Sequence, residues 1–123
     1  MKDPEAMSGV YALLSSGSLT ERHPEHPNNF FVSHHFKLGS LQVMEGLQDV
    51  YRAQEMVDRT AGLPFTTKTN EFLGVIDYIW CNAAVRIYQV LDYPSLKEEE
   101  FPPIPNSMWP SDHLALGVTI GLS

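Results

Sequence analysis

Apolar residues recur at helical spacing near the start of the chain. The apolar positions that fall on one face of a helix over residues 3–17 are Met7, Val10, Tyr11 and Leu14. Asp3 is predicted to cap this helix, with Pro4 at the first helical position, where its missing N–H costs nothing. Gly17 is predicted to end it, because glycine readily adopts the left-handed conformation of a helix C-terminus.

Helical spacing returns over residues 40–58, where the apolar positions are Val43, Leu47, Val50 and Val57. Gly46 falls inside this pattern and lowers its helix propensity. Residues 18–37 lie between the two stretches and contain two prolines and four of the five histidines, without a helix or strand period. The pattern therefore predicts helix, surface loop, helix for the first half.

The second half changes to short runs of β-branched and aromatic residues bounded by Asn, Gly and Pro. Three strands are predicted, at residues 72–81, 85–91 and 114–122. An acidic, proline-rich connector, residues 92–110, separates the last two and is too long for a simple hairpin. Helices followed by strands predict an α+β or α/β fold with an antiparallel component.

Composition limits the classes of protein that fit. The 123 residues are 43% hydrophobic, which suffices for the core of one domain and not of two. A net charge of −7 argues against binding of nucleic acid through a broadly basic protein surface. A single cysteine excludes a disulfide framework and a multi-cysteine zinc site. Without an apolar run of membrane-spanning length or a signal-peptide layout, we expect an intracellular protein that is not in a membrane.

Asp77 lies among large apolar residues, in Gly-Val-Ile-Asp-Tyr-Ile-Trp, where strand propensity disfavours aspartate. An ionised carboxylate in such a place is costly unless it is paired or hydrogen-bonded. His113 is a natural partner, because a carboxylate fixes the tautomer of an imidazole and raises its basicity. The residues also allow Asp77 to point outward on the polar face of a strand, so both interpretations stay open.

Four other features have both a functional and a structural interpretation. Ser111, Asp112 and His113 are consecutive, and neighbours on an extended chain point to opposite faces, which excludes a hydrolase triad among them. Phe72 fits either a platform that stacks on a nucleic-acid base or a core side chain. Cys81 has no nearby cation and is expected to be a buried thiol rather than a nucleophile. A metal site formed by the loop histidines His23, His26, His34 and His35 is not favoured, since no cysteine or framing helix accompanies them.

Several motifs occur together and in order along the second half of the chain. They are Pro64-Phe65-Thr66-Thr67, Phe72-x-Gly-x-Ile-Asp77-Tyr78-Ile-Trp80, Ile104-Pro105-Asn106 and Pro110-Ser111-Asp112-His113-Leu114-Ala115-Leu116. This set resembles the C-terminal half of the endonuclease/exonuclease/phosphatase superfamily, in its carbon-catabolite-repressor deadenylase branch, which includes nocturnin and Angel proteins. The resemblance is strongest over residues 63–82 and 104–120, and extends more weakly to residues 10–17 and 34–41.

The resemblance implies a four-layered α/β sandwich and magnesium-dependent 3′–5′ hydrolysis of RNA tails such as poly(A). Asp77 matches the family aspartate that orients the catalytic histidine, and His113 matches that histidine, which contacts the scissile phosphate. Asp112 matches the adjacent aspartate near the Mg²⁺ ion, as a catalytic and metal-site residue. Phe72 matches the aromatic residue that stacks on a substrate base. Thr67 stands at a substrate-binding position where the family often has Asn, so one phosphate or ribose contact differs.

The resemblance also implies that residues 1–123 form one incomplete domain. The family's metal-binding glutamate and its Gly-Asp-Phe-Asn segment have no counterpart here, so the principal Mg²⁺ ligand is expected upstream, and the chain alone is expected to be inactive. Two alternatives remain: a non-catalytic interaction module, and a related phosphodiesterase acting on another phosphate ester. Expected partners are RNA 3′ ends, deadenylase-complex proteins and a second copy bound through an exposed sheet face. The expected compartment is the cytoplasm, the nucleus or both.

Overall fold

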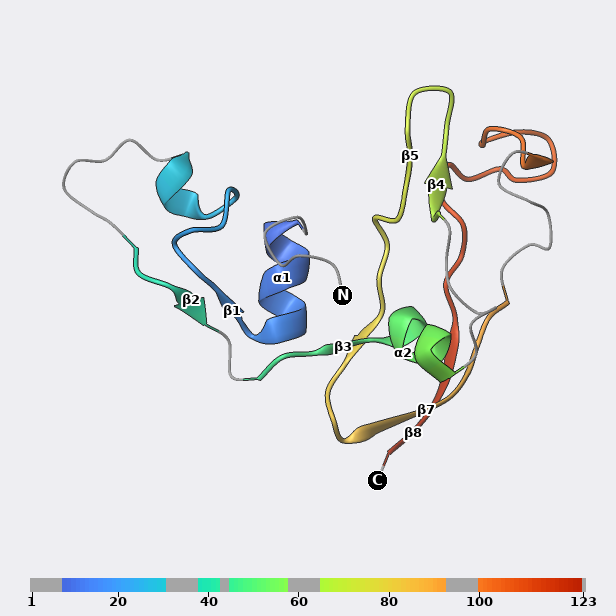
Figure 1. Ribbon diagram of the computed structural model, residues 1–123. Coiled ribbons are helices and arrows are strands. Elements are labelled where there is room, and N and C mark those ends of the chain that lie inside the picture. The colour runs from blue at the N-terminus through green and yellow to red at the C-terminus, as the bar shows by residue number, and fades with distance from the viewer. Residues whose placement is uncertain (1–7, 31–37, 43–44, 58–64, 93–99, 123) are drawn as a thin grey trace. The chain divides into compact units, whose positions relative to one another are not determined.

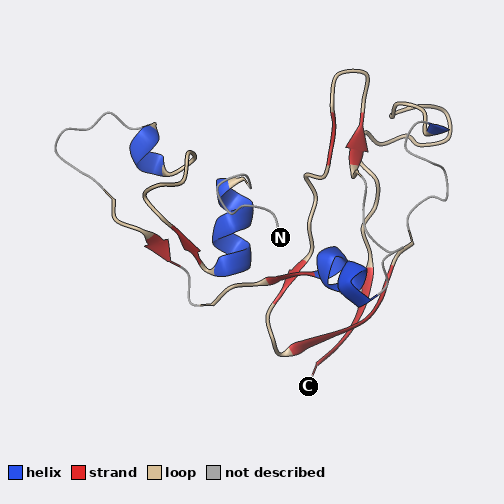
Figure 2. Cartoon of the chain, viewed as in Figure 1, coloured by secondary structure: helices blue, strands red, loops and turns tan. Residues whose placement is uncertain are grey.

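The structure is a computed structural model that describes residues 8–30, 38–42, 45–57, 65–92 and 100–122. The chain divides into two units, residues 1–48 and 49–123. In both, short helices and strands alternate with long irregular segments (Figures 1 and 2). The described strands form small two-stranded sheets, so the fold is mixed α/β with an antiparallel component, as predicted. In the described residues, no helix is long and apolar enough to cross a membrane.

Helix α1 (Gly9–Ser16) is the first element of the first unit. It begins later than predicted: Ser8 is the N-cap, and its hydroxyl accepts a hydrogen bond from the Tyr11 N–H. The predicted caps, Asp3 and Pro4, lie outside the described residues. Gly17 ends the helix as predicted, with φ of 85°, a left-handed conformation that favours glycine.

The segment after α1 is more ordered than the predicted surface loop. β1 (Ser18–Leu19) pairs antiparallel with β2 (Leu41–Gln42), and the 3-10 helix η2 (Pro27–Asn29) follows a series of turns. His23 and His26 are buried in these turns. Nδ1 of His23 accepts a hydrogen bond from the Glu25 N–H, and Nδ1 of His26 accepts one from Asn28. These two histidines therefore stabilise turns, while His34 and His35 lie outside the described residues.

The prediction of a single helix over residues 40–58 is wrong in its first part. Two short strands, β2 and β3 (Gln48–Asp49), occupy that part, and the helix is confined to α2 (Val50–Val57). Gly46 gives one physical reason. A Cβ atom at Gly46 would collide with the carbonyl oxygen of Ser15, so this glycine serves a close approach of two backbones.

The second unit carries the remaining strands. β4 (Thr67–Lys68) pairs antiparallel with β5 (Leu73–Gly74), and β6 (Trp80–Cys81) pairs with β3, whose Asp49 is the first residue of this unit. β7 (Val85–Val90) pairs antiparallel with β8 (Val118–Leu122). The predicted strand 85–91 is thus confirmed, the predicted strand 114–122 is reduced to β8, and the predicted strand 72–81 is broken into β5 and β6.

Two clusters of buried side chains form the core of the second unit. The first cluster joins α2 to β7 and β8, the two long strands, and contains Val50, Tyr51, Cys81 and Val90. The second contains Phe65, Phe101, Ile104 and Leu114, with Trp109 packed against it. Phe65 immediately precedes Thr66 and Thr67, and Leu114 immediately follows His113, so this second cluster supports the candidate site.

The hydroxyl of Tyr51 links the ends of the long strand pair. It donates to the carbonyl oxygen of Leu91 at 3.0 Å and accepts from the N–H of Gly117 at 3.1 Å. The Leu91 N–H in turn donates to the carbonyl oxygen of Gly117 at 2.7 Å. The residues just beyond β7 and just before β8 are therefore joined both directly and through a buried side chain.

Candidate functional site

Asp77 and His113 contact each other, although 36 positions separate them along the chain. Nδ1 of His113 lies 2.7 Å from Oδ2 of Asp77, within hydrogen-bonding distance. This confirms the contact expected from the sequence and excludes an Asp77 side chain without a partner. The expectation that Asp77 lies on a strand is wrong, because Asp77 belongs to the irregular segment between β5 and β6, drawn as loop in Figure 2. His113, which directly precedes the predicted strand 114–122, lies in a bend.

The tautomer of His113 follows from this contact. A carboxylate oxygen accepts hydrogen bonds, so Asp77 selects the form in which Nδ1 carries the proton. The other ring nitrogen, Nε2, is then the one that can act on a ligand. The side chains of His113 and Asp77 remain 38% and 34% exposed, so a ligand in solvent can reach the pair.

The surroundings of His113 raise its pKa above the ordinary value of 6.5. The largest cause is the hydrogen bond to Asp77, and the negative charges of Asp77 and Asp112 act in the same direction. Partial removal from water acts in the opposite direction and is outweighed. Because the folded pKa is above the unfolded one, the contact stabilises the fold fully below pH 6.5, and this contribution is lost as the pH rises through the folded pKa.

We therefore expect Asp77→Asn to lower the pKa of His113, because the substitution removes the charge and the strongest acceptor of the imidazole proton. An NMR titration of the His113 ring measures this directly. Asp92→Asn is the control, since it removes another exposed carboxylate of the second unit. An unchanged His113 titration in Asp77→Asn would contradict the contact.

Thr67, which the family resemblance matches to a substrate-binding position, is buried, with 4% of its surface exposed. Its Oγ1 lies 3.2 Å from Nδ1 of His113 and is a second acceptor for the proton on that nitrogen. Thr67 therefore supports the imidazole. Sequence analysis missed this contact because nothing in the local pattern around Thr67 indicates that it meets a residue 46 positions away.

Phe72 lies at the surface, at the end of the hairpin between β4 and β5. Its side chain is 46% exposed, which excludes the core interpretation. The ring lies against Gly74, where a Cβ atom would come within 2.9 Å of Cζ of Phe72. The Phe72 N–H donates to the Thr69 hydroxyl at 3.0 Å, and its carbonyl accepts from the Thr69 N–H at 2.8 Å. The hairpin thus presents an aromatic ring on a fixed backbone.

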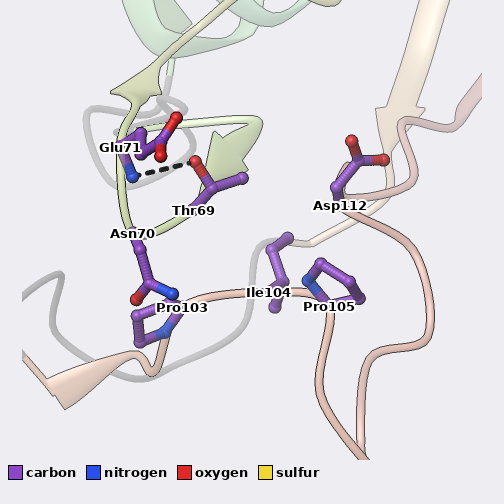
Figure 3. A pocket seen from close by; sticks show the side chains of 7 residues that line it. All are labelled: Thr69, Asn70, Glu71, Pro103, Ile104, Pro105 and Asp112. Carbon is purple, nitrogen blue, oxygen red and sulfur yellow. Dashed lines mark hydrogen bonds between the residues drawn. The ribbon is translucent and has the colours of Figure 1, made fainter.

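Asp112 lines an open pocket of about 530 Å³ beside the hairpin (Figure 3). The other lining residues come from the hairpin loop and from a proline-rich segment: Thr69, Asn70, Glu71, Pro103, Ile104 and Pro105. Hard cations such as Mg²⁺ are held by one or two carboxylates together with water and substrate phosphates. Asp112 is an exposed carboxylate of this type, but no cluster of three or more possible metal ligands occurs among the described residues. These residues do not form a complete metal centre.

Cys81 is buried, and burial raises the pKa of its thiol. A thiol with a raised pKa is a weak nucleophile at neutral pH, which agrees with the structural role predicted for Cys81.

Comparison with known proteins finds several that are similar to this chain in sequence. The "CCR4-Not complex 3′-5′-exoribonuclease subunit Ccr4" of Coccidioides immitis is 33% identical over 113 residues, which is 89% of this chain. The protein of the same name from Schizosaccharomyces pombe is 30% identical over 115 residues, and that from Aspergillus oryzae is 29% identical over 111 residues. The chain is a relative of the Ccr4 subunits.

This relationship confirms the resemblance inferred from the motifs of the second half. The Ccr4 proteins are much longer: the chain spans 14% of the Coccidioides immitis Ccr4 and 15% of the Schizosaccharomyces pombe Ccr4. No family model and no solved structure matches the chain. The relationship to Ccr4 therefore rests on sequence, and the Asp77–His113 contact is an independent observation on the chain itself.

Proposed function

We propose that this chain supplies the Asp–His part of a metal-dependent 3′–5′ exoribonuclease that hydrolyses phosphodiester bonds in RNA tails such as poly(A). The observation that carries the proposal is the 2.7 Å contact between Asp77 and His113 in a relative of Ccr4. In this proposal residues 1–123 form part of one endonuclease/exonuclease/phosphatase domain, and the small sheets described above belong to its four-layered α/β sandwich.

His113 acts directly on the substrate in this proposal. Its Nε2–H, positively charged below the raised pKa, donates a hydrogen bond to an oxygen of the scissile phosphate and stabilises the charge that develops there. Asp77 holds the imidazole in the required orientation, and its negative charge favours the protonated ring. Thr67 supports the same nitrogen of the ring. The protein groups thus orient one cationic donor toward one phosphate.

Mg²⁺ is the proposed cofactor, and it would neutralise phosphate charge and help to generate the attacking hydroxide. Asp112 is the carboxylate of the described residues that we propose to hold it, with the principal ligand supplied by another part of the protein. The chain alone is then expected to show no Mg²⁺-dependent cleavage above background. Cleavage by the chain alone that His113→Ala stops would mean that the chain completes its own metal site, with Asp112 the first residue to test.

A chimera tests the proposed function. The segment of the Schizosaccharomyces pombe Ccr4 that matches this chain over 115 residues is replaced by the chain's own sequence, and the protein is assayed with labelled oligo(A) RNA and Mg²⁺. The expected result is stepwise shortening from the 3′ end. The control is the same protein with the segment deleted, which should be inactive.

Two other results would support the alternatives. A chimera that melts cooperatively but cleaves no phosphodiester would favour a non-catalytic interaction module. This alternative draws on the lack of a complete ligand set in the described residues. Hydrolysis of other phosphate esters without shortening of oligo(A) would favour a related phosphodiesterase.

Phe72 is proposed to stack on a base of the RNA, because its exposed ring is held on a fixed hairpin. Stacking contributes roughly 1–3 kcal/mol per base, so Phe72→Ala in the chimera should raise KM about 5- to 150-fold and change kcat little. Leu73→Ala is the matched control, since Leu73 is the next residue and is similarly exposed, at 48%, without an aromatic ring. Equal effects of the two substitutions would contradict stacking.

The names of the relatives describe them as subunits of a CCR4-Not complex. We propose that the chain acts inside the cell, in the cytoplasm, the nucleus or both, with proteins of such a complex as partners.

Self-association is proposed for the isolated chain. Ile120 and Leu122 are 49% and 83% exposed, and their cross-strand partners Ile87 and Val85 pack on the first core cluster. Residues paired across two strands share a face, so the core-bearing face of this sheet continues into exposed apolar surface. We expect the 123-residue chain to dimerise or aggregate with rising concentration in analytical ultracentrifugation, and Leu122→Glu to reduce this. A concentration-independent monomer would contradict it.

A further inference from the structure

Thr66 is a residue to which the Ccr4 similarity assigns no role. It forms hydrogen bonds with the backbone at Asp77 and with the backbone next to His113. It is fully buried, with no exposed surface. Its hydroxyl oxygen accepts hydrogen bonds from two successive backbone N–H groups, those of Ile76 at 2.9 Å and Asp77 at 3.3 Å. The side chain of Thr66 therefore fixes the backbone from which the Asp77 carboxylate projects.

The backbone of Thr66 forms a hydrogen bond next to His113, the other member of the pair. Its carbonyl oxygen accepts from the N–H of Leu114, the residue after His113, at 2.7 Å. Its own N–H donates to the carbonyl oxygen of Gly74 at 2.9 Å. One residue thus fixes the backbone at Asp77 through its side chain and beside His113 through its main chain.

We propose that Thr66 is the positioning residue that sets the geometry of the Asp77–His113 pair. Among the described residues, no strand pairs with the N–H groups of Ile76 and Asp77, and the Thr66 hydroxyl takes the place of such a partner. Threonine suits this role because its branched Cβ restricts χ1 and so keeps the oxygen in place. An isosteric valine would leave two partly buried N–H donors without their acceptor, and the backbone would move to satisfy them.

The contact with His113 gives a readout that a general loss of stability would not produce. While Asp77 is held in place, neutral His113 carries its proton on Nδ1. Free imidazole has no such constraint. If Asp77 is displaced, the proton population on Nδ1 falls. ¹⁵N chemical shifts of the His113 ring, recorded above its pKa, report this tautomer in the full 123-residue chain.

The experiment compares three substitutions. Thr66→Val removes the oxygen and is expected to shift His113 away from the Nδ1–H tautomer. Thr66→Ser keeps the oxygen and is expected to leave the tautomer as in the wild type. Thr69→Val is the matched control, because the Thr69 hydroxyl also accepts from two successive N–H groups, those of Glu71 and Phe72, in the hairpin loop.

An unchanged tautomer in folded Thr66→Val, or an equal change in Thr69→Val, would overturn the proposal. If Thr66→Val does not fold, amide hydrogen exchange in the wild type and in Thr66→Ser tests the proposal instead. The Ile76 and Asp77 amides are expected to be protected in the wild type and in Thr66→Ser. Rapid exchange of both amides in the folded wild-type chain would overturn the proposal equally.

The effect of Thr66 on catalysis rests on the proposed function, whereas the tautomer measurement does not. In the active chimera, Thr66→Val is expected to lower kcat by up to about 10²-fold with little change in KM, as misplacement of a catalytic group does. Thr66→Ser is expected to restore most of this loss. A shifted tautomer in a chain whose chimera is inactive would support the positioning role and contradict the exonuclease.

Discussion

His113→Ala is expected to reduce the turnover of the chimera by about 10²–10⁴-fold, the range typical of a lost proton-transfer or charge-stabilising group. The substitution removes the ring that the Asp77 carboxylate orients. Because the group acts in the transition state, kcat should fall while KM changes little. Single-turnover assays with oligo(A) measure the chemical step without interference from product release.

Asp77→Asn completes this experiment. The amide keeps the shape of the carboxylate but carries no charge, so it stabilises less well the protonated form of His113, which is the form that donates from Nε2. Turnover should therefore fall strongly, and a double substitution of Asp77 and His113 should cost little more than His113→Ala alone, because the two residues act as a unit. Gln89→Ala, at an exposed position on β7, is the control. Turnover of His113→Ala within a factor of about two of the control would refute the catalytic role.

Phe65→Ala is expected to destabilise the second unit by about 3–5 kcal/mol, the usual cost of removing a buried phenylalanine. Phe65 has no exposed surface, and its ring packs edge-on against Phe101 with the centroids 5.1 Å apart. A loss of this size approaches the whole stability of a small domain. Urea denaturation followed by tryptophan fluorescence measures it, because Trp109 packs on the same cluster.

Phe30→Ala provides a matched control in the first unit. Phe30 is 66% exposed, so its truncation is expected to change stability by less than about 0.5 kcal/mol. Similar shifts for Phe65→Ala and Phe30→Ala would mean that the buried cluster does not hold the second unit together.

The Asp77–His113 contact could be predicted from the sequence because of the chemistry of Asp77. A carboxylate inside a run of large apolar residues needs a partner, whatever the fold, and His113 is a suitable acid–base partner beside a predicted strand. Gly17 as the end of α1 was predictable for a similarly local reason, since its left-handed conformation is one that glycine favours.

Other features depended on contacts that the local pattern does not reveal. The predicted strand 72–81 is broken because the Thr66 hydroxyl takes the N–H groups of Ile76 and Asp77, which a strand would offer to a neighbouring strand. The predicted helix 40–58 fails at Gly46, which lies against the backbone of Ser15. In both cases a partner distant in the sequence overrides the local propensity.

The Tyr51 hydroxyl described above has a consequence for which residues can replace Tyr51. Phenylalanine would keep an aromatic ring in the first core cluster but would remove the donor to the Leu91 carbonyl and the acceptor of the Gly117 N–H. A polar group that loses its partner in a partly buried place lowers stability, so the substitution that is most conservative in shape is not conservative here.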